Sequence, residues 1–105
     1  MDEVVWKVLS TVAKRGFLGA TREDLFREAR GIGYDELEQI LLDLEAEGHL
    51  TIEWIGMNKF IATITPDGAA IARAEFLRQI DAIRRRAAEQ MAAAGGGDDG
   101  AAKGN

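Results

Sequence analysis

The part of the chain that decides the fold is residues 44–68, LEAEGHLTIEWIGMNKFIATITPDG. Its first residues complete a helical pattern that ends at Gly48, because glycine readily takes the left-handed conformation that closes a helix. Apolar and polar side chains then alternate with a period of two along residues 50–55. A break at residues 56–58 precedes a second run, residues 59–65, that is rich in β-branched side chains. This change of period predicts a β-hairpin.

The end of this stretch predicts the start of a long helix. Thr65 can cap a helix whose first position is Pro66, the one position where a helix readily accepts proline. The helical pattern continues over residues 66–92, well beyond the average helix length, so this helix needs a partner. Apolar side chains recur along it at coiled-coil spacing. We therefore expect a dimer interface formed by Phe76, Leu77, Ile80, Ile83, Ala87 and Met91.

Upstream of the hairpin, apolar residues recur at helical spacing in three further segments. The first segment stops at Gly16, and a short apolar connection leads to Thr21. Thr21 is a good N-cap residue for the second segment, which has an acidic first turn and stops at Gly31. The third segment runs from Gly33 to Gly48. Two helices joined by a brief glycine turn predict a helix-turn-helix unit.

Length and composition indicate one soluble domain. The 105 residues fit the usual size range of a domain, and no apolar run approaches the roughly 18 residues of a membrane-spanning helix. The N-terminus lacks the basic and apolar blocks of a signal peptide, so we expect a cytoplasmic protein with no membrane partner. We expect a folded domain over residues 1–65 and a dimerisation helix over 66–92. The tail, 93–105, is rich in Ala, Gly and Asp, which predicts disorder.

Two motifs resemble those of winged helix-turn-helix transcription regulators, notably the PadR-like and MarR-like groups. In those proteins the third helix ends in Leu-Glu-x-x-Gly-x-Leu/Ile, which residues 44–50 match, and the second strand ends in Leu/Ile-Thr-Pro-x-Gly, which residues 64–68 match. The resemblance implies a mostly helical α+β fold with three helices, a β-hairpin wing and a long C-terminal helix. It also implies a homodimer whose third helices face successive major grooves of double-stranded DNA, about 34 Å apart.

The resemblance further implies that Tyr34 and Gln39 of the third helix enter the major groove. It implies that the wing tip, with Gly56, Met57, Asn58 and Lys59, reaches the minor groove or the DNA backbone. Phosphate contacts need positive charge, which three arginines around the second helix provide. The predicted DNA-binding residues are therefore Arg22, Arg27, Arg30, Tyr34, Gln39, Asn58 and Lys59. Surface arginines on a helix also form i,i+4 ion pairs, as Arg27 would with Glu23.

The charge distribution leaves a second function open. The formal net charge is −5 at pH 7, and the segment between Gly33 and Gly48 holds neither Lys nor Arg. Its six acids are Asp35, Glu36, Glu38, Asp43, Glu45 and Glu47. Acids repel phosphates, although a carboxylate can accept a hydrogen bond from cytosine N4. The alternative function is therefore a protein–protein interaction module whose acidic third helix binds a basic protein partner.

Other residue types predict packing rather than chemistry. Trp6 lies beside the apolar face of the first helix and Trp54 alternates in register with Leu50, so both are expected in the core or in a dimer interface. His49 is the only histidine and the chain has no cysteine, so no metal site is expected. The sequence also has no glycine-rich phosphate loop and no histidine-based triad, so we expect neither a cofactor nor enzymatic activity.

Overall fold

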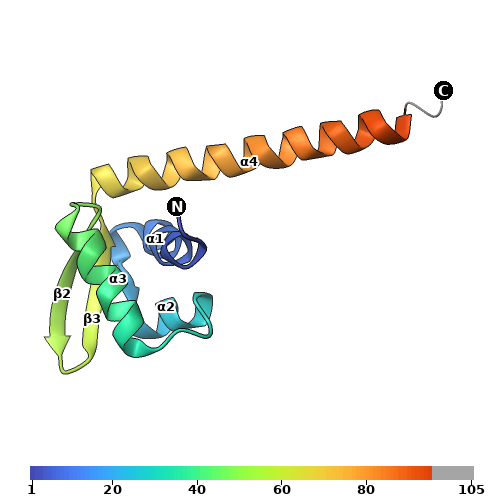
Figure 1. Ribbon diagram of the computed structural model, residues 1–105. Coiled ribbons are helices and arrows are strands. Elements are labelled where there is room, and N and C mark those ends of the chain that lie inside the picture. Colours follow the sequence, from blue (N-terminus) through green and yellow to red (C-terminus); the bar gives the residue numbers. More distant parts are fainter. Residues whose placement is uncertain (96–105) are drawn as a thin grey trace. The chain divides into compact units, whose positions relative to one another are not determined.

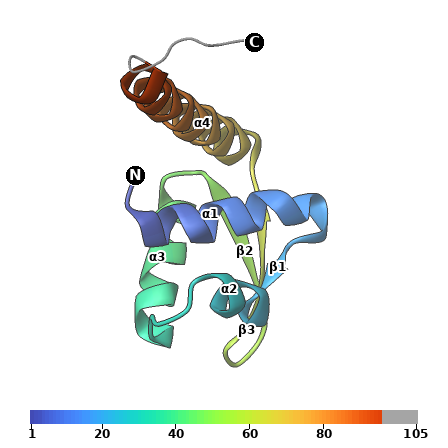
Figure 2. The same cartoon turned by 90° about the vertical axis from the view of Figure 1, so that its right-hand side faces the viewer.

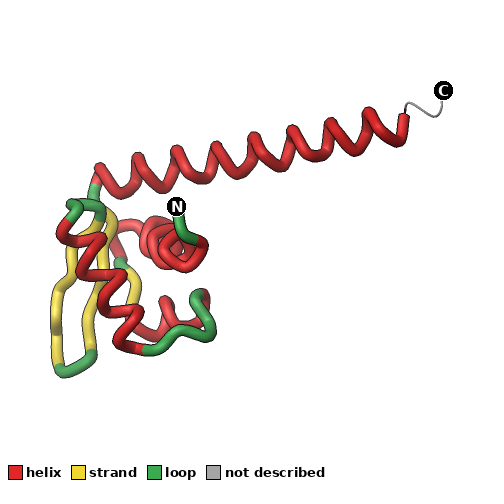
Figure 3. The backbone as a smooth tube through the Cα atoms, viewed as in Figure 1, coloured by secondary structure: helices red, strands yellow, loops and turns green. Residues whose placement is uncertain are grey.

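The structure is a computed structural model that describes residues 1–95 (Figure 1). Within that range the fold is α+β and mostly helical, as predicted. Its elements are α1 (Glu3–Arg15), the 3-10 turn η1 (Gly16–Leu18), β1 (Ala20–Thr21), α2 (Arg22–Glu28), α3 (Tyr34–Ala46), β2 (Leu50–Gly56), β3 (Lys59–Ile64) and α4 (Pro66–Gly95). Figure 3 shows helices α2 and α3 joined by a short loop, and the hairpin that follows them. This order is that of a winged-helix-like fold.

The strands form one antiparallel sheet with the order β1-β3-β2. Leu50 pairs with Ile64 and Trp54 with Phe60, which confirms the predicted hairpin. The sequence did not indicate β1: the short apolar connection expected before Thr21 contains η1 and then this two-residue strand, whose Ala20 pairs with Ala62. β3 is therefore the central strand of the sheet.

Helices α1, α2 and α3 lie on one side of the sheet, as Figures 1 and 2 both show. Between them and the sheet lies a core of aliphatic side chains and one aromatic. The core contains Val8, Leu9, Val12, Ala20, Leu25, Ala29, Leu37, Leu41, Leu44, Leu50, Phe60, Ala62 and Ala72. Trp6 packs against this core as expected. Trp54 is 45% exposed and its ring meets the ring of Phe60 edge-on, so it lies outside the core, and its alternative expected place in a dimer interface stays a prediction.

The junction between α3, the sheet and α4 explains the two sequence motifs. Gly48 has φ of 83°, the left-handed conformation predicted for the residue that ends α3. The Thr65 hydroxyl donates to the Gly48 carbonyl at 2.6 Å and accepts from the Gly68 N–H at 3.0 Å, so it caps α4 as expected. A Cβ on Gly68 would lie 1.8 Å from the carbonyl oxygen of His49. The glycine of the second motif is therefore required by a close backbone approach.

Residues Met1–Ala74 form one compact unit, and a second unit begins at Glu75 within α4. Helix α4 ends at Gly95, so Ala93–Gly95, expected in the tail, are helical. The remainder of the predicted disordered tail, residues 96–105, lies outside the described residues. Most of the predicted stripe on α4 is exposed, including Phe76 and Ile83. Over residues 1–95, no helix is long and apolar enough to cross a membrane.

Candidate nucleic-acid interface

Tyr34 is held at the start of α3 by two side chains from α2. Its ring lies 6.4 Å from the ring of Phe26 in a tilted arrangement. The guanidinium of Arg22 lies over the same ring, 5.6 Å from its centroid, within the range of a cation–π interaction. These contacts tie the first turn of α3 to α2. They bring together two of the predicted DNA-binding residues, Arg22 and Tyr34.

The three predicted arginines differ in how far they are neutralised. Arg22 lies 3.7 Å from Glu23, and Arg27 lies 3.4 Å from Asp24. The expected i,i+4 partner of Arg27 was Glu23, but the pair forms at i,i+3 with Asp24 instead. Arg30 makes a hydrogen bond only to the carbonyl of Arg27, at 3.4 Å. Within residues 1–95, Arg30 is therefore the one arginine of this set with no carboxylate partner.

Asp24 organises the start of α2. Its carboxylate accepts from the Thr21 N–H at 3.0 Å, and the Thr21 hydroxyl accepts from the Asp24 N–H at 3.2 Å, which together make a capping box. These hydrogen bonds, the backbone one above all, hold the pKa of Asp24 below its usual range, with help from Arg15 and Arg27. Asp24 therefore stays ionised and keeps Arg15 and Arg27 beside the helix start.

The acids of α3 divide into two groups. Glu45 accepts a hydrogen bond from the Ile52 N–H of β2 at 3.2 Å, Asp43 accepts one from Gln39 at 2.9 Å, and Glu47 lies 3.6 Å from His49. The other three acids are Asp35, Glu36 and Glu38, and none of them has a cationic partner in the described part of the chain. The outward face of α3 is therefore negative, as the sequence indicates.

The wing tip is a tight turn between β2 and β3. Gly56 pairs with Lys59 after a shift in the strand register, which leaves Met57 and Asn58 as the loop. Asn58 has φ of 59°, a left-handed conformation that asparagine tolerates better than most residues. Lys59 is exposed and has no ion-pair partner within the described residues. Met57 is 91% exposed at the tip.

Three elements that carry the predicted residues meet at one end of the unit formed by Met1–Ala74. Figures 1 and 2 both place α2, the N-terminal end of α3 and the hairpin tip there. Gln39 lies further along α3 and is engaged by Asp43. Direct contact is made by Arg22 and Tyr34, whereas Asn58 and Lys59 stand apart on the hairpin. The arrangement offers an exposed helix start flanked by cations.

Two residues with distinct roles were missed by sequence reasoning. Glu45 was counted with the acidic surface of α3, but its carboxylate covers an N–H of β2, the strand at one edge of the sheet. Such a contact protects a sheet edge from pairing with another chain. Met57 was counted with the rest of the wing tip, but no role of its own was predicted for it. A large apolar side chain beside Gly56 and Asn58, where turns are usually polar, is the signal that could have marked it.

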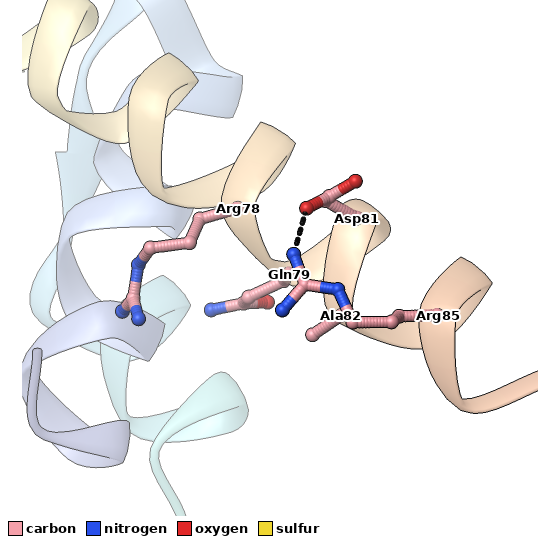
Figure 4. A pocket seen from close by; sticks show the side chains of 5 residues that line it. All are labelled: Arg78, Gln79, Asp81, Ala82 and Arg85. Carbon is pink, nitrogen blue, oxygen red and sulfur yellow. Dashed lines mark hydrogen bonds and ion pairs between the residues drawn. The ribbon is translucent and has the colours of Figure 1, made fainter. Parts of the chain in front are cut away.

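A shallow hollow of about 350 Å³ lies on α4 and is lined by Arg78, Gln79, Asp81, Ala82 and Arg85 (Figure 4). Its two arginines already have partners. Arg78 lies 2.7 Å from Glu75, and Arg85 pairs with Asp81. The hollow therefore offers no free guanidinium to an anion. Among residues 1–95 no group of His, Asp or Glu side chains is arranged to hold a metal ion.

No protein-family model matches the chain, and no curated protein matches it. A solved structure from Ralstonia eutropha JMP134, described as a candidate DNA-binding protein, is 21% identical to it. The two structures superpose with a TM-score of 0.63 over 72% of this chain and 98% of that one. At this level of sequence identity the similarity shows a shared fold and nothing further. The chain is thus similar in fold to that protein, with helices on one side of a small antiparallel sheet.

Proposed function

We propose that the protein is a homodimeric transcription regulator that binds double-stranded DNA. One observation carries the proposal: α2, the start of α3 and the hairpin tip converge at one end of a winged-helix-like unit. A helix start projecting between two flanks is the geometry by which helix-turn-helix proteins approach a major groove. The fold of the Ralstonia protein supports the same reading.

In this proposal the affinity comes mainly from the flanks. Arg30 and Lys59 have no carboxylate partners within residues 1–95, so contact with a phosphate would break no existing ion pair. Arg22 and Arg27, by contrast, are already paired with Glu23 and Asp24. Tyr34 would contribute a hydroxyl and an aromatic face at the start of α3. Phosphate contacts position a protein on DNA, whereas base contacts specify the sequence.

The proposed dimer forms through α4. Exposed apolar side chains at coiled-coil spacing along a solvated helix cost free energy unless a partner covers them. A second copy of the same helix offers a matching stripe. A two-fold dimer would then present two copies of the α2–α3 end to one DNA duplex.

Charge reversal tests the DNA contact. We expect R30E combined with K59E to weaken binding to a 30-base-pair duplex and to flatten its salt dependence, since each lost phosphate contact changes the slope of log K against log salt by about 0.9. The measurement is fluorescence anisotropy between about 50 and 200 mM salt. The matched control is R84E, because Arg84 lies on α4, outside the proposed interface. Equal salt slopes for wild type and R30E/K59E would refute this contact.

A second candidate function rests on the unpartnered acids of α3. Asp35, Glu36 and Glu38 form a negative surface that complements a basic protein partner. Reversing Glu38 and Asp43 to lysine separates the two functions. For a DNA-binding protein we expect E38K/D43K to bind DNA as well as wild type or more tightly. For an interaction module the same variant loses its basic partner, measured by isothermal titration with polylysine.

A further inference from the structure

The hairpin ends in an exposed apolar tip that the proposed phosphate contacts do not use. Met57 is 91% exposed, Ile55 is 59% exposed and Trp54 is 45% exposed. These three side chains fall within four consecutive residues, interrupted only by Gly56. Neighbouring residues of a strand face opposite sides of the sheet, so Trp54 and Ile55 make the hairpin apolar on both sides of the tip, where Met57 lies in the turn. The tip is therefore a candidate contact surface in its own right.

The hairpin carries almost no net charge to bind DNA electrostatically. Over residues 50–64 its charged side chains are Glu53 and Lys59, one of each sign. Glu53 pairs across the sheet with Ile61, set back from the tip. Counterion release, the main source of non-specific affinity for DNA, is thus small for this element. Beyond the one phosphate contact proposed for Lys59, any contribution of the hairpin tip must come from apolar contact.

The tip is held in a defined shape. Asn58 closes the turn in the left-handed conformation, and Gly56 pairs with Lys59 directly below it. Trp54 and Phe60 pack edge-on, with ring centroids 5.4 Å apart, which braces both strands near the turn. Because the backbone of this turn is already ordered, binding does not have to order it. Met57 is exposed on this turn.

We propose that Met57 acts as an apolar wedge between adjacent base pairs of duplex DNA, inserted from the minor groove, which the family resemblance already implies for the wing tip. The inference rests on the proposed function. Minor-groove proteins insert apolar side chains, methionine among them, between base steps. Met57 is unbranched, which suits insertion between flat bases. Asn58 and Lys59 follow it directly and can reach the groove edge and a phosphate.

The position of the tip supports DNA over an apolar protein surface as its partner. The tip lies at the same end of the unit as α2 and the start of α3, where the proposed phosphate contacts are (Figure 2). A duplex engaged by those helices therefore runs past the hairpin. An apolar wedge would also make binding depend on the DNA sequence, which contacts between cations and phosphates do not. Pyrimidine–purine steps such as TA unstack readily, whereas A-tracts are stiff, so Met57 favours DNA with a flexible step.

Two 30-base-pair duplexes of equal charge test the wedge, one with central TA steps and one with a central A-tract. We expect wild type to prefer the TA duplex in low-salt anisotropy titrations. M57A should bind that duplex about tenfold more weakly and lose the preference, with an unchanged salt slope. K59A should keep the preference for the TA duplex. Its slope of log K against log salt should become shallower by the amount expected for about one phosphate contact. F17A is the matched control, because Phe17 is also 91% exposed but lies in η1, away from the tip.

Trp54 provides a second measurement at the tip itself. In a W6F background it is the only tryptophan, and we expect DNA to protect it from acrylamide quenching. If wild type binds DNA but M57A binds equally well with the same preference, the wedge is wrong and the proposed function stands. If wild type binds neither duplex, the proposed function fails and the wedge with it. If M57A abolishes self-association while its DNA binding stays unchanged, the tip is a protein contact and the wedge is overturned.

Discussion

Gly68 illustrates how much of this fold depends on one missing side chain. The residue sits in the first turn of α4, where a Cβ would meet the carbonyl oxygen of His49 at 1.8 Å and its carbonyl carbon at 2.7 Å. Both neighbours are backbone atoms, so neither can swing aside. The approach is close because Thr65 bonds both Gly48 and Gly68, which draws the start of α4 onto the end of α3.

G68A should therefore destabilise the protein by about 2 kcal/mol or more, the scale of overpacking in a core. The measurement is the free energy of unfolding from urea titrations followed by circular dichroism. G33A is the matched control: Gly33 is the N-cap residue of α3, and a Cβ there meets no atom within 4 Å. A G68A protein as stable as G33A would show that the junction is looser than the structure indicates.

Glu45 shows why some residue roles cannot be read from sequence. Six acids on one helix predict a solvated negative surface, and for Asp35, Glu36 and Glu38 the structure agrees. The role of Glu45 depends on β2 passing within hydrogen-bond distance of α3, a tertiary contact between residues seven apart in the chain. Sequence spacing alone indicates neighbours on a helix, not partners across a turn.

Among the elements, α2 depends most on its capping box. The helix has seven residues, too few to be stable from helix propensity alone. Asp24 and Thr21 satisfy each other's backbone N–H groups, and Arg15 places its guanidinium nitrogen 3.7 Å from the Asp24 carboxylate. Since Arg22 and Phe26 on this helix hold Tyr34, loss of the cap would also release the start of α3.

The lowered pKa of Asp24 gives this contribution a pH dependence. A carboxyl group whose folded pKa lies below its unfolded value stabilises the fold above the unfolded value, about 3.9, and the effect is lost as the pH falls through the folded pKa. We expect D24N to be about 1 kcal/mol less stable than wild type at pH 7. The difference should shrink toward pH 3. D35N, in the first turn of α3, is the control, and a D24N deficit that does not shrink at all between pH 7 and pH 3 would contradict the assignment.

Elements with a strong repeating pattern were predictable, and the short ones were not. The switch of hydrophobic period at Gly48 and the Thr65–Pro66 start of α4 predicted the hairpin and the long helix. A strand of two residues has no period, so β1 could not be predicted, although it makes β3 the central strand. The sequence was enough to predict which cationic residues lie at the candidate site. Their pairing could not be predicted, because the choice of Asp24 over Glu23 by Arg27 depends on the turn geometry.

At the scale of the whole molecule, the stripe on α4 predicts assembly. We expect I83K to convert a dimer to a monomer, because Ile83 lies at the middle of the exposed apolar positions and a lysine there would bring like charges together. Solution mass by light scattering over a range of concentrations is the measurement. A88K is the control, since Ala88 lies off the stripe. Equal masses for wild type and I83K would exclude this interface.

The charge of the whole protein sets the conditions under which DNA binding can be seen. With a formal net charge of −5, the protein is repelled by DNA except where its local cations face the phosphates. Screening reduces the long-range repulsion, but added salt also weakens phosphate contacts through counterion release. Binding through a few phosphate contacts is therefore expected to be strongest at low ionic strength.

Retention of genomic DNA fragments by the wild-type protein in a gel-shift titration at about 50 mM salt tests the central claim most directly. The account predicts retarded complexes that weaken steadily as salt is raised and that a charge-matched single-stranded competitor does not displace. Free migration of every fragment at low salt, with the protein folded in the same buffer, would contradict it.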